Sequence, residues 1–495
     1  MAMTPETAQA RRMGRLPERT GLFYAGGWHE PVARGRILSR NPATGADLCQ
    51  VGAADAADLD RTVTAARAAQ KGWAALAPLG RARILRAAAA RIREHKAELA
   101  LLDALDSGNP VMGMEFDVEL GATLMEFFAG LATEIKGETI PVGAGKLNYV
   151  QREPLGVVAR IVPFNHPVLF VLAKMSAPLI AGNAVILKPS EETPLSALRV
   201  AEIVGDLFPA GVFNVLNGHR DLGVAISAHP GIANVSVVGS VATGRAVMRQ
   251  GAETLKRVVL ELGGKNALVI CADADPDKAI AGALKGMNLG WTAGQSCGST
   301  SRVFVHDSLY DMVVSRLAAA FQAIEPGDPV LPTTQMGCLS TKAQYDKTLE
   351  YIAIAKGEGA RMVAGGAVDL PGPLSNGYFV RPTLFADVTQ DMRIAREEVF
   401  GPVLSVLRWS DKQAMLEAVN GLDLGLTASI WTRDLALAFE LVNAIEAGYV
   451  WVNNSSDHFL GVPFGGVKQS GIGREECLEE LLAYTEQKNV SITLD

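Results

Sequence analysis

VVLELGGKNALVI, residues 258–270, and LGWTAGQSCGST, residues 289–300, are the two ends of one stretch around which the rest of the chain is organised. The first end holds a carboxylate, Glu261, followed by Gly263 and Gly264, and the second holds Cys297 in a turn of small residues. Glu261 and Cys297 lie 36 positions apart, too far to be neighbours on one helix, so the fold must bring them together. A thiolate is a nucleophile, and a carboxylate can take a proton from water. The stretch therefore predicts covalent catalysis at a carbonyl group, followed by hydrolysis.

The composition is that of a globular protein of two or three domains, with 495 residues, 48% hydrophobic and 20% charged. The formal net charge of −7 offers no basic face for nucleic acid. No apolar run is long enough for a membrane helix, and the N-terminus lacks the apolar stretch of a secretory signal. The five cysteines are scattered without a CxxC pattern, so we expect no metal site and a reducing, cytoplasmic location.

Short apolar strands alternate with helical segments from Gly156 onward, which predicts doubly wound, parallel α/β sheets. Residues 1–55 look irregular, two helices follow them, and a long helical pattern covers 115–134. A second β-α series begins after Gly264, so we expect two α/β domains in tandem, with Glu261 and Cys297 at their junction. The expected strands cover 157–162, 184–187, 212–216, 235–238, 267–270, 303–305 and 448–453.

Two exposed segments read as strands outside these domains. Residues 139–142 and 147–150 predict a hairpin, and residues 489–494 alternate like another strand. Isolated hairpins are marginally stable and strand edges invite pairing. The segments either cap one sheet or pair across subunits.

The strand AVILK ends at Lys188 and is followed by Pro189, Ser190 and Glu191. Nucleotides bind outside the carboxyl ends of such strands. A carboxylate at Glu191 could accept hydrogen bonds from both ribose hydroxyls and would repel a 2′-phosphate, which favours NAD over NADP. The alternative is a helix N-cap at Ser190 with Glu191 in the first turn.

A second turn, in NVSVVGSVATGRAVM, places Gly239, Ser240 and Gly244 between a strand and a helix. Glycine lets the backbone approach a phosphate, and the helix start offers free N–H groups. The turn is not GxGxxG, and the absence of a P-loop lysine pattern argues against ATP.

Seven motifs in order make the chain resemble the NAD(P)-dependent aldehyde dehydrogenase superfamily over nearly its whole length. They are PFNHP (163–167), KPSE (188–191), the Gly-Ser turn (239–244), ELGGKN (261–266), GQSCGS (294–299), EEVFGPV (397–403) and PFGGVKQSGIGRE (463–475). The resemblance implies an NAD-binding domain (1–132 and 154–258), a catalytic domain (259–465) and an oligomerisation arm (133–153 and 480–495). It also implies strands shared between subunits in a homodimer or homotetramer.

The resemblance assigns roles to individual residues. Cys297 would attack the aldehyde, Asn165 would donate to the oxyanion, and Glu261 would activate water to hydrolyse the thioester. Lys174 and Glu475 match a lysine and a glutamate implicated in relaying the proton, although surface charge is an alternative role for both. The residues implied to bind NAD are Pro163, Lys188, Ser190, Glu191, Gly239, Ser240, Gly244, Glu398 and Phe400.

Aromatic residues around the expected pocket predict an aromatic or other bulky apolar aldehyde rather than acetaldehyde. Ala173 stands where many relatives that take small aldehydes carry a bulky aromatic, which should open the pocket. Phe170 and Phe464 could instead be core residues. The lining candidates are His166, Phe170, Ala173, Trp291, His458, Phe459 and Phe464.

Two departures from the family pattern leave the pocket shape open, Trp291-Thr292-Ala293 before Gly294 and Val467 in place of a frequent tyrosine. Two other functions compete with hydrolytic oxidation. One is CoA-acylating semialdehyde dehydrogenation, against which Glu261 argues. The other is a catalytically inactive binding or structural protein, which would need neither Cys297 nor Glu261.

Overall fold

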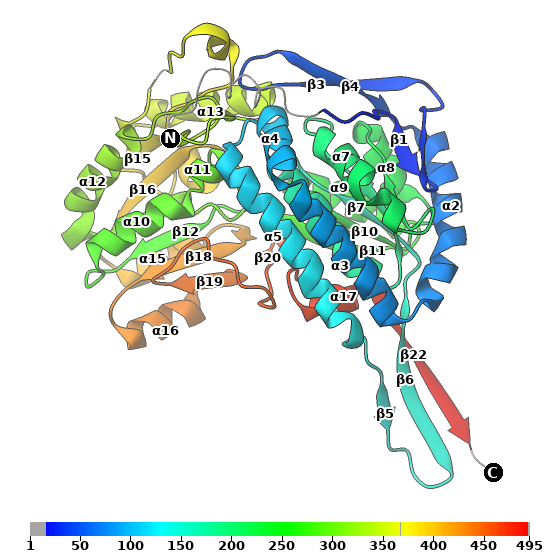
Figure 1. The fold of residues 1–495 in the computed structure, drawn as a ribbon. Helices are drawn as coiled ribbons and strands as arrows, with labels where there is room; N and C mark the ends of the chain where they lie inside the picture. Colours follow the sequence, from blue (N-terminus) through cyan, green and yellow to red (C-terminus); the bar gives the residue numbers. More distant parts are fainter. Residues whose placement is uncertain (1–15, 367, 494–495) are drawn as a thin grey trace.

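The computed structural model describes residues 16–366 and 368–493, and its first sheet runs in the order β2-β1-β9-β8-β7-β10-β11-β21 (Figure 1). The five strands from β9 to β11 are parallel, whereas β1, β2 and β21 are antiparallel additions at the two edges. The strands are β1 (Leu22–Tyr24), β2 (Gly27–His29), β7 (Val157–Ile161), β8 (Ala184–Lys188), β9 (Phe213–Val215), β10 (Asn234–Gly239), β11 (Arg257–Leu262) and β21 (Gly471–Ile472).

Both faces of the first sheet are buried, as the apolar runs predict. In β7 and β8, Val158 and Val185 face one core cluster, whereas Ala159 and Ile186 face the other. Helices α3 to α7 belong to the first cluster, and α2, α8 and α9 to the second. These helices are α2 (Ala56–Ala75), α3 (Pro78–Glu94), α4 (Lys96–Ser107), α5 (Val111–Gly130), α6 (Pro167–Ile180), α7 (Leu195–Val204), α8 (Arg220–Ala228) and α9 (Val241–Ala252).

The second sheet runs in the order β14-β15-β16-β13-β12-β18-β19 and is parallel except for β14. In β12, Leu268 and Ile270 face one core cluster while Ala267 and Val269 face the other, so this sheet is also covered on both sides. Its strands are β12 (Ala267–Ile270), β13 (Arg302–His306), β14 (Arg361–Ala364), β15 (Thr383–Ala386), β16 (Val403–Trp409), β18 (Thr427–Trp431) and β19 (Tyr449–Val452).

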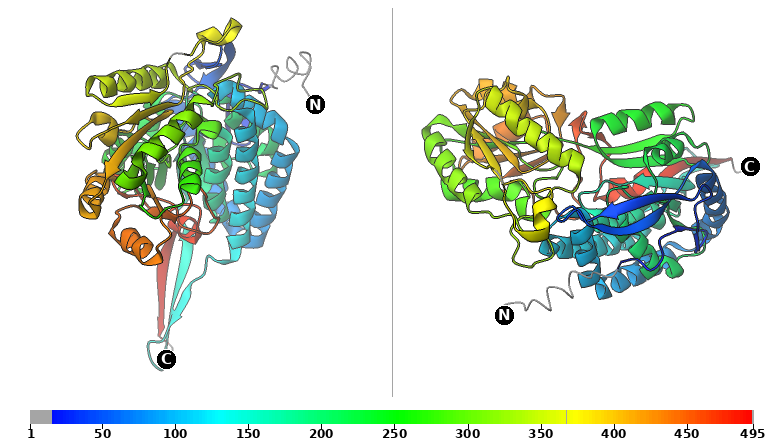
Figure 2. Two further views of the ribbon diagram at one scale, coloured as in Figure 1. Left: turned by 90° about the vertical axis from the view of Figure 1, so that its left-hand side faces the viewer. Right: turned by 90° about the horizontal axis from the view of Figure 1, so that it is seen from above.

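Helices α10 and α12 pack on one face of the second sheet, and α13 to α16 pack on the other. Two doubly wound α/β units therefore lie side by side (Figure 2), which confirms the predicted fold class. The helices of the second half are α10 (Pro276–Gly286), α11 (Leu289–Thr292), α12 (Tyr310–Gln322), α13 (Lys342–Gly357), α14 (Arg393–Arg396), α15 (Lys412–Asn420), α16 (Leu435–Ala444) and α17 (Leu478–Ala483).

A three-stranded antiparallel sheet projects from the body as an arm (Figure 1). Its strands are β5 (Glu138–Ile140), β6 (Lys146–Pro154) and β22 (Thr485–Thr493), and β22 pairs with β6 along its whole length. Ile140, Leu147 and Ile492 are exposed on the arm. The predicted hairpin and C-terminal strand are therefore present, in one sheet.

Two expectations for the N-terminal third are wrong. The segment 22–53 is not irregular, because it forms β1 and β2 and a hairpin of β3 (Gly35–Arg40) with β4 (Asp47–Ala53). Three helices follow instead of two, since the helical pattern expected as one helix breaks at His95 into α3 and α4. The predicted helix 115–134 begins earlier, at Val111, and ends in a 3₁₀ turn at 131–133.

The predicted domain boundary at 258 falls inside β11, and β21 returns to the first sheet from beyond the predicted catalytic domain. Two short strands, β17 (Leu424–Gly425) and β20 (Val467–Lys468), pair with each other. Within the described residues, no helix is both long and apolar enough to cross a bilayer. Residues 1–15 of the predicted NAD-binding domain and 494–495 of the predicted arm lie outside the described residues.

Candidate active site

The fold brings Glu261 and Cys297 into contact. Glu261 is near the carboxyl end of β11 in the first sheet, and Cys297 lies in the turn that leads from α11 to β13 in the second. Both side chains line the same cavity, and each shifts the pKa of the other. Burial, followed by the negative charge of Glu475, raises the pKa of Glu261 to about 8. Burial and the neighbouring Glu261 raise the pKa of the Cys297 thiol well above its usual value. A nucleophile and a base thus meet at the junction of the two sheets.

Asn266 fixes the cysteine turn. Its side-chain amide donates to the carbonyls of Cys297 at 2.7 Å and Ser299 at 3.0 Å, while its own oxygen accepts the N–H of Thr427 at 3.0 Å. A Cβ on Gly264 would lie 2.3 Å from the Asn266 oxygen, so a glycine is required there. Asn266 was not predicted as a site residue. The sequence signal that could have identified it is a polar residue two positions after the glycine pair.

Asn165 lies in the loop between β7 and α6 and lines the same cavity as the thiol. One N–H of its amide donates to the Gln295 carbonyl at 2.8 Å, and its backbone carbonyl accepts from Asn109 at 2.8 Å. An amide carries two N–H donors, so one remains for a ligand. The side chain is held in place by the same turn that carries Cys297.

One cavity joins these residues with several of the predicted cofactor residues. Its walls come from the carboxyl ends of β10 and β11, from the loop after β7, from α13 and from the segment before β16. The lining residues are Pro163, Phe164, Asn165, Val238, Gly239, Ser240, Glu261, Gly263, Cys297, Gln344, Lys347, Glu398 and Phe400. Among them, Phe164, Val238, Gly263, Gln344 and Lys347 were not predicted.

Glu398 is tied to the glycine pair. The Gly264 N–H donates to one of its carboxyl oxygens at 3.1 Å, and a Cβ on Gly263 would lie 2.2 Å from the other. That second oxygen has no hydrogen-bond partner among the described residues. Burial raises the pKa of Glu398, and the Gly264 N–H and Lys347 oppose the rise. An acceptor is therefore free to bind a hydroxyl group in the cavity.

Phe400 has a left-handed backbone with φ of +60°, a conformation that is costly for a bulky residue. The side-chain amide of Gln344, near the start of α13, donates to the carbonyls of Val399 at 2.7 Å and Phe400 at 2.8 Å. These two hydrogen bonds hold the strained segment. The ring of Phe400 meets that of Phe164 at 6.0 Å, edge to face.

Lys188 and Glu191 lie at the carboxyl end of β8, as predicted. The ammonium of Lys188 donates to the Glu191 carboxylate at 3.3 Å, and burial lowers the pKa of this lysine. The alternative of a helix N-cap at Ser190 is wrong, because α7 begins only at Leu195. The Ser190 hydroxyl instead accepts the N–H of Glu192 at 3.2 Å.

Of the two glycines predicted to bind the cofactor near the turn between β10 and α9, one lines the cavity and the other does not. Gly239 and Ser240 line the cavity, and Ser240 caps α9 by accepting the N–H of Thr243 at 3.2 Å. Gly244 does not line it. A Cβ on Gly244 would lie 2.7 Å from the Leu262 side chain, so this glycine allows α9 to pack closely on β11.

Lys174 and Glu475 form a buried ion pair of 2.5 Å, and Arg160 lies 3.4 Å from both Glu475 and Glu480. Burial alone would lower the pKa of Lys174, but the charges of Glu475 and Glu480 raise it. Neither Lys174 nor Glu475 is a surface charge, since each is 4% exposed. Their charges also act on Glu261.

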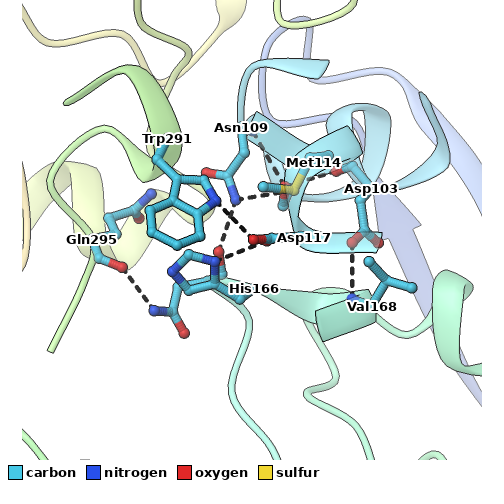
Figure 3. A network of polar contacts seen from close by, with 10 residues as sticks. Asp103, Asn109, Met114, Asp117, His166, Val168, Trp291 and Gln295 are labelled. Atoms are coloured by element: carbon cyan, nitrogen blue, oxygen red, sulfur yellow. Dashed lines mark hydrogen bonds and ion pairs between the residues drawn. The ribbon is translucent and has the colours of Figure 1, made fainter. Parts of the chain in front are cut away.

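The predicted substrate-pocket residues fall into two aromatic groups. His166 packs against Phe170 at 5.6 Å and Trp291 at 4.7 Å (Figure 3 shows His166 and Trp291). His458 packs against Phe464 at 4.6 Å. Ala173 is buried on α6, one residue before Lys174.

Phe459 is not brought together with the other aromatic residues. It is 63% exposed and makes no ring contact with a described residue. Asp117, which binds both His166 and Trp291, was not predicted.

Comparisons with known proteins agree over the whole chain. Residues 28–490 match the model of the aldehyde dehydrogenase family. A curated relative, aldehyde dehydrogenase tropH of Talaromyces stipitatus, is 48% identical over 97% of this chain and 94% of its own. The structure of a Bacillus cereus aldehyde dehydrogenase with NAD+ is 39% identical, covers 100% of both chains and superimposes with a TM-score of 0.94. An NADP-dependent enzyme of E. coli is 35% identical over 96% of this chain and 98% of its own, with a TM-score of 0.93.

Proposed function

The chain belongs to the aldehyde dehydrogenase family, and from this we propose that it oxidises an aldehyde to a carboxylic acid with NAD, through covalent adducts on Cys297. The observation that carries the proposal is that Cys297 and Glu261 line one cavity together with Asn165, Glu398 and Phe400. The cavity thus brings together a nucleophile, a base, a hydrogen-bond donor for the oxyanion and hydrogen-bond acceptors for a cofactor.

In the first step the Cys297 thiol loses its proton to solvent, and the thiolate sulfur attacks the aldehyde carbon. The negative charge that develops on the aldehyde oxygen is stabilised by the free N–H of Asn165 and by the Cys297 backbone N–H. Donors placed this way act on the transition state more than on the ground state.

Bound NAD would accept a hydride from the adduct, and the loss of that hydride would leave a thioester on Cys297. Glu398 would hold the nicotinamide ribose through its unpartnered oxygen, and Phe400 would pack near the ring. Glu261 then takes a proton from water, which attacks the thioester and releases the acid and the Cys297 thiol. The Lys174–Glu475 pair, buried near Glu261, would pass that proton onward.

NAD is preferred over NADP in this proposal because Glu191 carries negative charge where a 2′-phosphate would lie. Similar proteins include both an NAD+ complex and an NADP-dependent enzyme, so the preference needs a direct test. Glu191→Gln should reduce the NAD over NADP ratio of kcat/KM about tenfold, since one repulsive contact is removed. An unchanged ratio would assign the discrimination to other residues.

The substrate is proposed to be an aromatic or other bulky apolar aldehyde. Support comes from the ring cluster of His166, Phe170 and Trp291 and from the small Ala173. Benzaldehyde should therefore give a higher kcat/KM than acetaldehyde. A value for acetaldehyde equal to or above that for benzaldehyde would contradict the substrate class while leaving aldehyde oxidation intact.

Hydrolysis rather than transfer to CoA is proposed because Glu261 lies in contact with the nucleophile, where it can activate water. Adding CoA to the assay should change neither the rate nor the product. A catalytically inactive binding or structural protein would have no use for the Cys297–Glu261 pair.

The assembly and location are also proposals. The arm would pair with another subunit in a homodimer or homotetramer, because β5 presents an unpaired edge and exposed apolar side chains. All five cysteines are unpaired, in keeping with a reducing cytoplasmic compartment. The NAD-binding unit would end with β11 rather than at 258.

The deciding experiment is NAD reduction over a panel of aldehydes by the wild type, Cys297→Ala and Cys49→Ala. Cys49, on β4, is the matched control because it is the other cysteine that is not fully buried. Cys297→Ala should lose turnover but still bind NAD, and Cys49→Ala should keep both. Normal turnover by Cys297→Ala would refute the mechanism.

A further inference from the structure

A fully buried carboxylate, Asp117, binds two aromatic side chains beside the proposed reaction centre. One of its oxygens accepts the indole N–H of Trp291 at 2.7 Å, and the other lies 2.8 Å from Nδ1 of His166 (Figure 3). Asp117 is 0% exposed and His166 is 6% exposed. The three residues come from α5, from α11 and from the loop before α6. They form a polar network inside an otherwise aromatic cluster.

The network adjoins the catalytic residues on both sides. His166 follows Asn165, and Trp291 lies in the same short segment as Gln295, whose carbonyl accepts the Asn165 amide. Figure 3 shows the indole and imidazole rings beside each other, and their centroids are 4.7 Å apart at an interplanar angle of 77°. His166 therefore lies one residue along the chain from the amide that would hold the aldehyde oxygen.

The contacts fix where the imidazole proton lies. The indole of Trp291 can only donate, so Asp117 accepts from it. Burial raises the pKa of Asp117, while the charge of His166 when protonated and the hydrogen bonds from His166 and Trp291 oppose the rise. As a carboxylate it also accepts from Nδ1 of His166, so in the neutral imidazole the lone pair is on Nε2. Nε2 has no hydrogen-bond partner among the described residues.

Burying a carboxylate is unfavourable, and two N–H donors offset the lost hydration only in part. An apolar residue at position 117 would pack between α5 and α6 without that cost. The carboxylate does, however, orient His166 and set its tautomer. This is the contribution that an apolar residue could not make.

We propose that Nε2 of His166 accepts a hydrogen bond from a hydroxyl group of the substrate, so that the preferred substrates are hydroxylated aromatic aldehydes. Asp117 is the positioning residue of this contact, because it acts on the substrate only through His166. The inference rests on the proposed function and narrows its substrate class. A pocket that holds a hydrogen-bonding group disfavours a substrate that leaves it unpaired.

The test compares 2-, 3- and 4-hydroxybenzaldehyde with the three methoxybenzaldehydes, which cannot donate a hydrogen bond. The assay is run below neutral pH, because the formyl group makes these phenols more acidic than the tyrosine side chain. The wild type should favour at least one hydroxy isomer over its methoxy partner about tenfold in kcat/KM. His166→Phe should abolish that ratio, whatever its effect on absolute rates, and His166→Gln, which retains an acceptor, should restore part of it.

Asp117→Asn tests the tautomer directly. The new amide must turn its oxygen to the Trp291 N–H and its NH₂ to Nδ1 of His166, which moves the imidazole proton to Nε2. Nε2 of His166 then donates a hydrogen bond where it accepted one before. The ratio of kcat/KM for hydroxy over methoxy substrates should therefore fall about tenfold, although the ring is still in place. If this variant does not fold, the two His166 variants still decide the question.

Two results overturn the inference. One is a wild type that uses each methoxy compound as well as its hydroxy partner, and the other is a hydroxy preference that survives in His166→Phe. In both cases benzaldehyde would still be oxidised, so the proposed function would stand. Absence of NAD-dependent oxidation of every aldehyde would instead refute the proposed function itself.

Discussion

The two sides of the Cys297–Asn165 pair are built differently. On the proposed cofactor side, Gly239, Gly263 and the strained Phe400 line the cavity. On the substrate side, the contacts are between side chains from distant segments, as in the network of Asp117, His166 and Trp291. Backbone requirements appear in the sequence as glycine-rich motifs, whereas side-chain networks leave no local pattern. The cofactor side is thus encoded locally, and the substrate side is encoded by the fold.

The largest effect is expected for Glu261→Gln, because Glu261 lies between the cofactor side and the substrate side. Replacing the carboxylate by an amide removes the base for hydrolysis, so the steady-state kcat should fall about 10²–10⁴-fold. Stopped-flow fluorescence should still detect an initial burst of NADH close to the enzyme concentration, because hydride transfer precedes hydrolysis. A variant without a burst would place Glu261 in the first chemical step instead.

Asn165→Ala should have the next largest effect. Losing one oxyanion donor costs on the order of 10²–10³ in kcat. The Asn165 amide also anchors Gln295, so NAD binding, measured by fluorescence titration, serves as the control for a cavity that is still formed. A kcat within a few-fold of the wild type would show that the oxyanion is stabilised elsewhere.

The pH dependence of hydrolysis should follow Glu261, whose pKa is raised to about 8. Below that pH the carboxyl is protonated and cannot take a proton from water, so the rate should fall about tenfold for each pH unit from 8 downward. Above it the rate should level off. Decay of the acyl-enzyme in a rapid-quench experiment measures this step, and a rate constant independent of pH would contradict the role of Glu261.

The smallest effect is expected for Gln344→Leu, which tests whether the backbone shapes the cofactor side. Without the two hydrogen bonds to the carbonyls of Val399 and Phe400, the strained segment should relax. The KM for NAD should rise about tenfold with little change in the KM for the aldehyde. Gln413→Leu, at an exposed glutamine of α15, is the control. Equal effects of the two substitutions would contradict a role of Gln344 in holding the Phe400 segment.

The parts of the fold that could be predicted are those in which both faces of a strand are buried. Apolar runs such as 157–162 and 267–270 have the length of a buried strand and are too short for a buried helix, and both form strands. The short strands β1 to β4 were missed because the segment before 55 is dominated by turn residues. The break at His95 was missed because the buried residues of α3 and α4 belong to one core cluster.

The candidate site divides in the same way. Several of the motif residues line the cavity, whereas Lys188, Ser190 and Glu191 do not, and Gly244 packs against Leu262. Asp117 could not be singled out, since Glu115 and Glu119 flank it on the same helix and only packing shows which acid is buried. Gln344 was missed for the same reason, because its importance comes from the unusual φ of Phe400 on another element.

The last strands of the chain complete its first half. β21 pairs with β11 next to Glu261, β22 pairs with β6, and Glu475 lies between them in the sequence. During synthesis the early part of the chain emerges and begins to fold first. Here, however, the edge of β11 and one side of β6 stay open until residues 471–493 have been synthesised. A chain cut before residue 471 would expose those strand edges and lack Glu475, so one segment completes both the edge of the first sheet and the arm.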